Sequence, residues 1–84
     1  MAAFWISGKY VGCERIQGVK KDGSAYDFYN FCFERVGNDH TIGKSYDVLS
    51  GQPTDFPDLL KKENIGKPAR YIKQKNYLFI CQFD

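Results

Sequence analysis

The first segment of the chain, residues 3–19, is longer than an ordinary strand and carries three glycines within a strand-like pattern. Strands in globular proteins usually run to about 3 to 10 residues. Gly8, Gly12 and Gly18 stand where side chains would otherwise crowd, and glycine inside a strand marks a bulge or a sharp bend. We therefore expect one long, bent strand, which is what a small closed barrel needs to serve two sheets at once.

Turn signals and alternating side chains predict the elements that follow. Asp22-Gly23 supplies the tight turn of a hairpin within residues 20–24. Period-two alternation then predicts four further strands, at residues 25–36, 41–49, 68–72 and 77–83. A short helix is predicted between the strands at residues 41–49 and 68–72. Its signals are Thr54 or Asp55 as the N-terminal cap, Pro57 in the first turn and Gly66 just beyond the end.

This order of elements predicts the fold class. Three strands, one short helix and a final hairpin are typical of the OB-fold, an all-β, five-stranded barrel with its helix between strands three and four. We assign the whole chain, residues 1–84, to this single domain. SH3-like barrels share much of the pattern, but they have no true helix before the last two strands.

Two of the predicted strands have aromatic side chains whose faces need assignment. Residues 25–36 present one row with Tyr26, Phe28, Asn30 and Cys32, and an opposite row with Tyr29, Phe31 and Phe33. One row is core, and the other is covered either by a partner or by a second layer of a larger core. Residues 77–83 should place Tyr77, Phe79, Cys81 and Phe83 on one face and Leu78 and Ile80 on the other.

Composition argues against catalysis and against a metal. His40 is the only histidine and lies in a polar turn, and the cysteines Cys13, Cys32 and Cys81 are widely spaced. We predict no enzyme activity, no cofactor, no metal and no small-molecule substrate, with the three cysteines reduced and buried as small apolar side chains. Residues 1–9 have no leader pattern and no segment is long enough to span a membrane, so we expect a cytoplasmic protein without a membrane partner.

The charges are few but unevenly distributed. Twelve basic and ten acidic side chains give a net charge of +2, yet residues 61–75 hold six basic side chains and one acidic one. Tyr71 and Tyr77 are interleaved with these cations. Cations beside aromatic faces are the two components of a surface that binds single-stranded nucleic acid. The ordinary alternative is a solvated helix end and hairpin tip.

Gly18-Val19, Lys21, Gly23 and Tyr26 stand in the pattern Gly-Val-x-basic-x-Gly-x-x-Tyr. This pattern resembles the DNA-binding wing of the gene V, or helix-destabilising, proteins of filamentous phages. Further matches to the central region of that family, displaced by about one residue, are Cys32-Phe33, Gly37-Asn38, Gly51-Gln52-Pro53, Pro57 and Leu59. The resemblance covers about half of the chain.

The resemblance implies a homodimer of OB-folds that coats single-stranded DNA with little sequence preference. It implies that Lys21 contacts phosphate, that Tyr26 stacks or packs at the wing, and that Phe28 lines the same groove. Phe33 stands at the later stacking aromatic of the family, unless the gap falls later and Glu34 takes that position. Together with the charge pattern, the candidate nucleic-acid-binding residues are Arg15, Lys20, Lys21, Tyr26, Phe28, Phe33, Lys44, Arg70, Lys73, Lys75 and Tyr77.

The same features permit two other functions. One is a protein-interaction module, OB-like or SH3-like, whose aromatic face binds a polypeptide. The other is an RNA-binding domain of the cold-shock type. Binding that weakens as the salt concentration rises indicates nucleic acid rather than a peptide at an apolar interface. Competition between DNA and RNA distinguishes a DNA-binding protein from an RNA-binding domain of the cold-shock type.

Overall fold

A long antiparallel hairpin of β1 (Ile6–Val19) and β2 (Ala25–Arg35) forms the largest part of the fold. The computed structural model describes residues 4–84, so the predicted start of the first strand at Ala3 and the beginning of segment 1–9 lie outside the described residues. The register of the hairpin shifts between Tyr10 and Gly12, which confirms the bulge predicted from the glycines.

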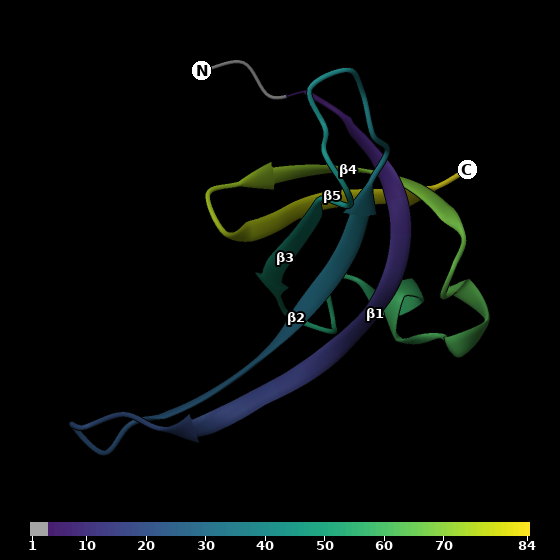
Figure 1. Cartoon of the computed structure of the whole chain (residues 1–84). Coiled ribbons are helices and arrows are strands. Elements are labelled where there is room, and N and C mark those ends of the chain that lie inside the picture. The colour runs from purple at the N-terminus through teal and green to yellow at the C-terminus, as the bar shows by residue number, and fades with distance from the viewer. Residues whose placement is uncertain (1–3) are drawn as a thin grey trace.

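Three shorter strands close the barrel, in the order β1-β2-β3-β5-β4. They are β3 (Tyr46–Gly51), β4 (Pro68–Gln74) and β5 (Tyr77–Phe83). Because β1 is long and bent, it pairs with β2 along most of its length and with β4 near its start. Figure 1 shows this strand curving along one side of the barrel and continuing beyond it into the long hairpin. The all-β, five-stranded barrel is therefore confirmed, and it is consistent with an OB-fold.

Closure between β3 and β5 is slight. These two strands run parallel and are paired only at Ser50 and Tyr77. Beyond Gly51 the chain leaves the sheet, while β2 and β5 continue. A gap in the hydrogen-bonded wall therefore opens beyond the end of β3.

The predicted helix between strands three and four is wrong in type and length. The segment forms two short 3₁₀ turns, η1 (Pro57–Leu60) and η2 (Lys62–Asn64), and neither has a side-chain cap. The backbone at Lys61 is extended, which separates them. Leu59 is buried in the barrel, and its carbonyl accepts a hydrogen bond from the Tyr10 hydroxyl. Anchoring of this carbonyl to the core favours a short turn over a continuing helix.

The third strand begins later than predicted. Residues 41–45 are not in a strand, Gly43 has a positive φ of 75°, and Ile42 is 99 % exposed. β2 ends at Arg35, and its last pairing with β3 joins Glu34 to Tyr46. Without a neighbouring strand to pair with, the alternation in residues 41–45 has no sheet to join.

The core contains the row of β2 that includes Phe31 and Phe33. The buried apolar residues are Tyr10, Phe31, Phe33, Leu49, Leu59, Ala69, Tyr71 and Leu78. The Phe33 ring stacks on Tyr71 with centroids 4.3 Å apart. Tyr29 packs against this core from its edge. The other row, with Tyr26 and Phe28, lies outside the core.

The predicted faces of β5 are wrong because the strand is irregular. Its register with β4 shifts between the Ile72–Ile80 and Lys73–Leu78 pairs, so Phe79 is an extra residue. Leu78 and Cys81 therefore both pack into the core, whereas Phe79 and Ile80 are exposed. A bulge of one residue reverses which side chains face outward.

The expectation of three buried cysteines is also wrong. All three are free, but Cys13 is exposed and Cys32 is only partly covered. Cys13 lies where β1 leaves the barrel, so few neighbours cover it. Cys81 packs against the core, and burial raises the pKa of its thiol to about 11.

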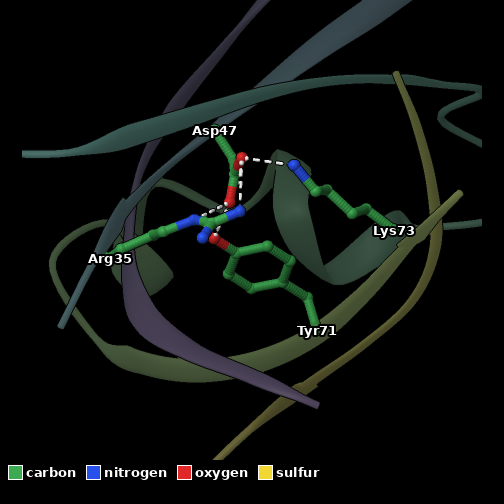
Figure 2. Close-up of polar contacts among 4 residues, drawn as sticks. All are labelled: Arg35, Asp47, Tyr71 and Lys73. Carbon is green, nitrogen blue, oxygen red and sulfur yellow. Dashed lines mark hydrogen bonds and ion pairs between the residues drawn. The ribbon is translucent and has the colours of Figure 1, made fainter. Parts of the chain in front are cut away.

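Asp47 is the one buried charged residue among residues 4–84. Figure 2 shows three side chains that donate hydrogen bonds to its carboxylate. Arg35 donates from Nε at 2.6 Å and from a terminal guanidinium nitrogen at 3.2 Å. The Tyr71 hydroxyl donates at 2.6 Å, and Lys73 Nζ donates at 3.0 Å. Burial alone would raise the pKa of Asp47, but these hydrogen bonds outweigh it and lower the pKa to about 2. The cluster ties β2, β3 and β4 together.

Candidate functional site

A groove with a volume of about 930 Å³ lies beyond the end of β3. One side comes from the part of the β1–β2 hairpin that extends past β3, residues 16–28, here called the arm. The other side comes from β5. Figure 1 shows the arm and the β4–β5 hairpin projecting from the barrel toward the same side. We call this groove the aromatic groove; its lining residues are Tyr26, Asp27, Phe28, Ser50, Gly51, Gln52, Asp55, Phe56, Tyr77, Leu78, Phe79, Ile80 and Cys81.

The arm places two half-buried aromatic rings in the aromatic groove. Tyr26 and Phe28 lie on the row of β2 that faces away from the core, and their ring centroids are 6.1 Å apart. Tyr26 is paired with Gly18 on β1, and its ring lies where a β-carbon at Gly18 would stand. Gly18 therefore allows the tyrosine ring to lie flat across the arm.

Further aromatic residues reach the groove from β5 and from the turn before η1. Tyr77 is 63 % exposed and Phe79 is 52 % exposed, while Phe56 packs its ring against Phe31 at 5.7 Å. Sequence reasoning placed Tyr77 in the site but missed Phe79 and Phe56. The bulge that makes Phe79 an extra residue left no sequence signal, because residues 77–83 are nearly all apolar and contain no glycine or proline that would mark it.

Unpaired lysines stand at the two hairpin tips. Lys20 and Lys21 lie in the turn of the arm, where Gly23 has a positive φ of 91° and its amide donates to the Lys20 carbonyl at 2.9 Å. This confirms the predicted Asp-Gly turn. Lys75 lies in the turn between β4 and β5. Within residues 4–84 none of these three lysines forms an ion pair, so their charges are open to solvent.

The other predicted cations are held by carboxylates. Arg15 donates two hydrogen bonds to Asp27, at 3.0 and 2.7 Å, and Lys73 belongs to the Asp47 cluster. The Lys44 ammonium lies 3.4 Å from Glu34, and the Arg70 guanidinium lies 3.4 Å from Asp84 and over the Trp5 ring. These four residues do not line the aromatic groove.

Phe33 is not a surface residue. It is fully buried and stacked on Tyr71 inside the barrel, so its ring cannot reach a ligand. The residue faces inward because the bulge in the hairpin lies in β1, while β2 alternates without a break. The alternative position, Glu34, is partly exposed and forms ion pairs with Lys9 and Lys44.

The structure also places the single histidine and the potential metal ligands. No group of three or more histidine, cysteine or acidic side chains within residues 4–84 lies close enough to hold a metal ion. His40 lies in an exposed loop, where its backbone amide donates to the Asn38 side chain at 2.8 Å.

Comparison with protein-family models, with curated proteins and with solved structures finds no match to this chain. Across residues 4–84, none of the helical segments has the length and apolar character needed to cross a membrane.

Proposed function

We propose that this chain is a non-enzymatic protein that binds single-stranded DNA with little sequence preference, as in phage or plasmid replication. The observation that supports the proposal most directly is the aromatic groove between two hairpins whose tips carry unpaired lysines. Aromatic rings stack on any base, and lysines neutralise phosphates. The motif that resembles the wing of the gene V proteins lies on the arm, at one side of this groove.

The aromatic side chains of the groove favour a single strand over a duplex. Tyr26, Phe28, Tyr77 and Phe79 can stack only on bases whose faces are exposed, and the bases of a duplex are stacked on each other. We therefore assign stacking to these four residues and phosphate contact to Lys20, Lys21 and Lys75.

We further propose a homodimer, which the resemblance implies. The outward face of β3 offers a site for a second copy, because Tyr46 and Val48 are exposed beside the partly covered Cys32 of β2. This face is separate from the aromatic groove. Sedimentation equilibrium of the parent and of Val48→Lys tests the assignment, and a parent that sediments as a monomer contradicts it.

The decisive experiment is a titration of fluorescent single-stranded and duplex oligonucleotides at several salt concentrations, followed by anisotropy. Each phosphate neutralised on a single strand contributes about −0.7 to the slope of log affinity against log salt, so three lysines predict a slope of about −2. Lys21→Ala should weaken binding and reduce the magnitude of the slope by about 0.7. Lys62→Ala is the matched control, because Lys62 is also an exposed lysine without an ion pair within residues 4–84 but lies in η2, outside the groove.

Phe79→Ala tests stacking separately from charge. Loss of one stacking ring should weaken binding by about 1 to 3 kcal/mol without changing the salt slope. Because Phe79 is half exposed, the barrel should remain folded, and circular dichroism checks this. Equal binding of duplex and single strand, or affinity that ignores salt, would refute the proposal.

One observation favours a second candidate function, a protein-interaction module. Between its single pairing with β3 at Tyr77 and its end at Phe83, the edge of β5 that faces the groove has no partner strand within residues 4–84. Such an edge accepts an extended peptide as an added strand. A peptide bound in this way responds little to salt, so the same titration separates the two candidates.

A further inference from the structure

The aromatic groove has an unusual distribution of charge for a surface that meets DNA. Its lining includes no lysine, arginine or histidine, and its two charged residues are both acidic, Asp27 and Asp55. The unpaired cations Lys20, Lys21 and Lys75 are at the hairpin tips instead. Coulomb repulsion from Asp55, whose carboxylate has no ion-pair partner within residues 4–84, therefore disfavours phosphates in the groove, whereas the lysines favour them at the tips.

The two carboxylates are not equivalent. Both oxygens of Asp27 accept hydrogen bonds from Arg15, whose positive charge neutralises this carboxylate. The Asp55 side chain is exposed and makes no hydrogen bond or ion pair within residues 4–84. Asp55 lines the aromatic groove together with Gln52 and Phe56, so the lining contains one carboxylate acceptor that no side chain in the described part of the chain occupies.

We infer that the bases enter the aromatic groove and that Asp55 accepts hydrogen bonds from their exocyclic amino groups. The inference rests on the proposed function and adds a preference among bases to it. An ionised carboxylate only accepts hydrogen bonds, so it distinguishes base edges that donate from those that do not. Bases with an amino group are favoured, and the preference remains modest because stacking contributes to the binding of every base.

Cytosine and uracil provide the cleanest comparison. The two rings have the same size, and they differ at the Watson–Crick edge. Cytosine presents an amino group at C4, whereas uracil presents a carbonyl there, and its N3–H lies between two carbonyl oxygens that repel a carboxylate. Asp55 should therefore favour oligo(dC) over oligo(dU).

The test measures the affinities of oligo(dC) and oligo(dU) for the parent, Asp55→Asn and Asp39→Asn at one salt concentration and neutral pH. An asparagine at position 55 both donates and accepts, so it accommodates either base. We expect the oligo(dC) to oligo(dU) affinity ratio to fall by about tenfold in Asp55→Asn, which is near the lower end of the range for a hydrogen bond to a charged group, because Asp55 is exposed to water. Asp39→Asn removes the same charge from an exposed loop outside the groove and should leave the ratio unchanged.

The outcomes separate this inference from the proposed function. If the parent binds both oligonucleotides with the expected salt slope and Asp55→Asn leaves the ratio unchanged, the inference is wrong and the proposed function stands. If Asp55→Asn strengthens binding of both oligonucleotides equally, Asp55 acts only through its charge, and the inference is again wrong. A parent that binds neither oligonucleotide overturns both.

Discussion

Replacing Asp47 with asparagine tests the cluster that joins three strands of the barrel. The carboxylate has a pKa of about 2 in the folded protein, against an ordinary value of 3.8. This lowering of the pKa on folding corresponds to about 2 kcal/mol of stability. Because the folded pKa is the lower one, this stability is present above about pH 4 and is lost as pH falls toward 2. Asp47→Asn should lack this contribution at every pH.

The assay is urea unfolding of the parent and of Asp47→Asn at a series of pH values. At neutral pH we expect the variant to be less stable by about 2 to 3 kcal/mol, because Arg35 and Lys73 lose their shared partner but remain about one-third exposed to water. The difference should shrink toward zero near pH 2. Asp39→Asn, in an exposed loop, is the control and should follow the parent. A difference that is the same at acidic and neutral pH would show that the charge of Asp47 is not what stabilises the barrel.

Three further predictions concern the arm, the core and the thiols. Gly18→Ala places a β-carbon against the Tyr26 ring and should therefore weaken binding of single-stranded DNA, measured by anisotropy. The thermal unfolding of the barrel, measured by calorimetry, should change little. Phe33→Ala should lower the free energy of unfolding by about 3 to 5 kcal/mol, because the ring is fully buried, and urea titration that finds no loss contradicts its place in the core. In the folded protein Cys13 should react with a thiol reagent well before Cys81, whose pKa of about 11 and partial burial slow it, and peptide mapping identifies the modified residue.

The succession of five strands along the chain could be predicted from the sequence because it depends on local patterns. Asp22-Gly23 indicated the hairpin turn, and the glycines of the first segment indicated the bend and bulge of β1. The faces of β2 remained open because both rows are aromatic, and only the position of the barrel decides that Phe33 faces inward.

The site was less predictable than the fold because it depends on tertiary details. Phe79 lines the site at a bulge in β5, and nothing in the sequence of this strand marks the bulge. Lys73 is not part of the site, because its ammonium donates a hydrogen bond to Asp47, a residue distant in the sequence. Single-residue irregularities and long-range ion pairs have no local signature, so periodicity does not reveal them.

The arm extends beyond the point where β3 ends, so its backbone is held by only one neighbouring strand. A two-stranded ribbon is marginally stable when it is isolated. The arm should therefore open by local fluctuations that leave the barrel folded, and its amide protons should exchange with solvent far faster than those of β4. Hydrogen exchange along the chain would thus fall into two classes that divide near Tyr29, where pairing with β3 begins. Under the proposed function, a wall that fluctuates in this way would let the width of the aromatic groove adjust to purines and pyrimidines alike.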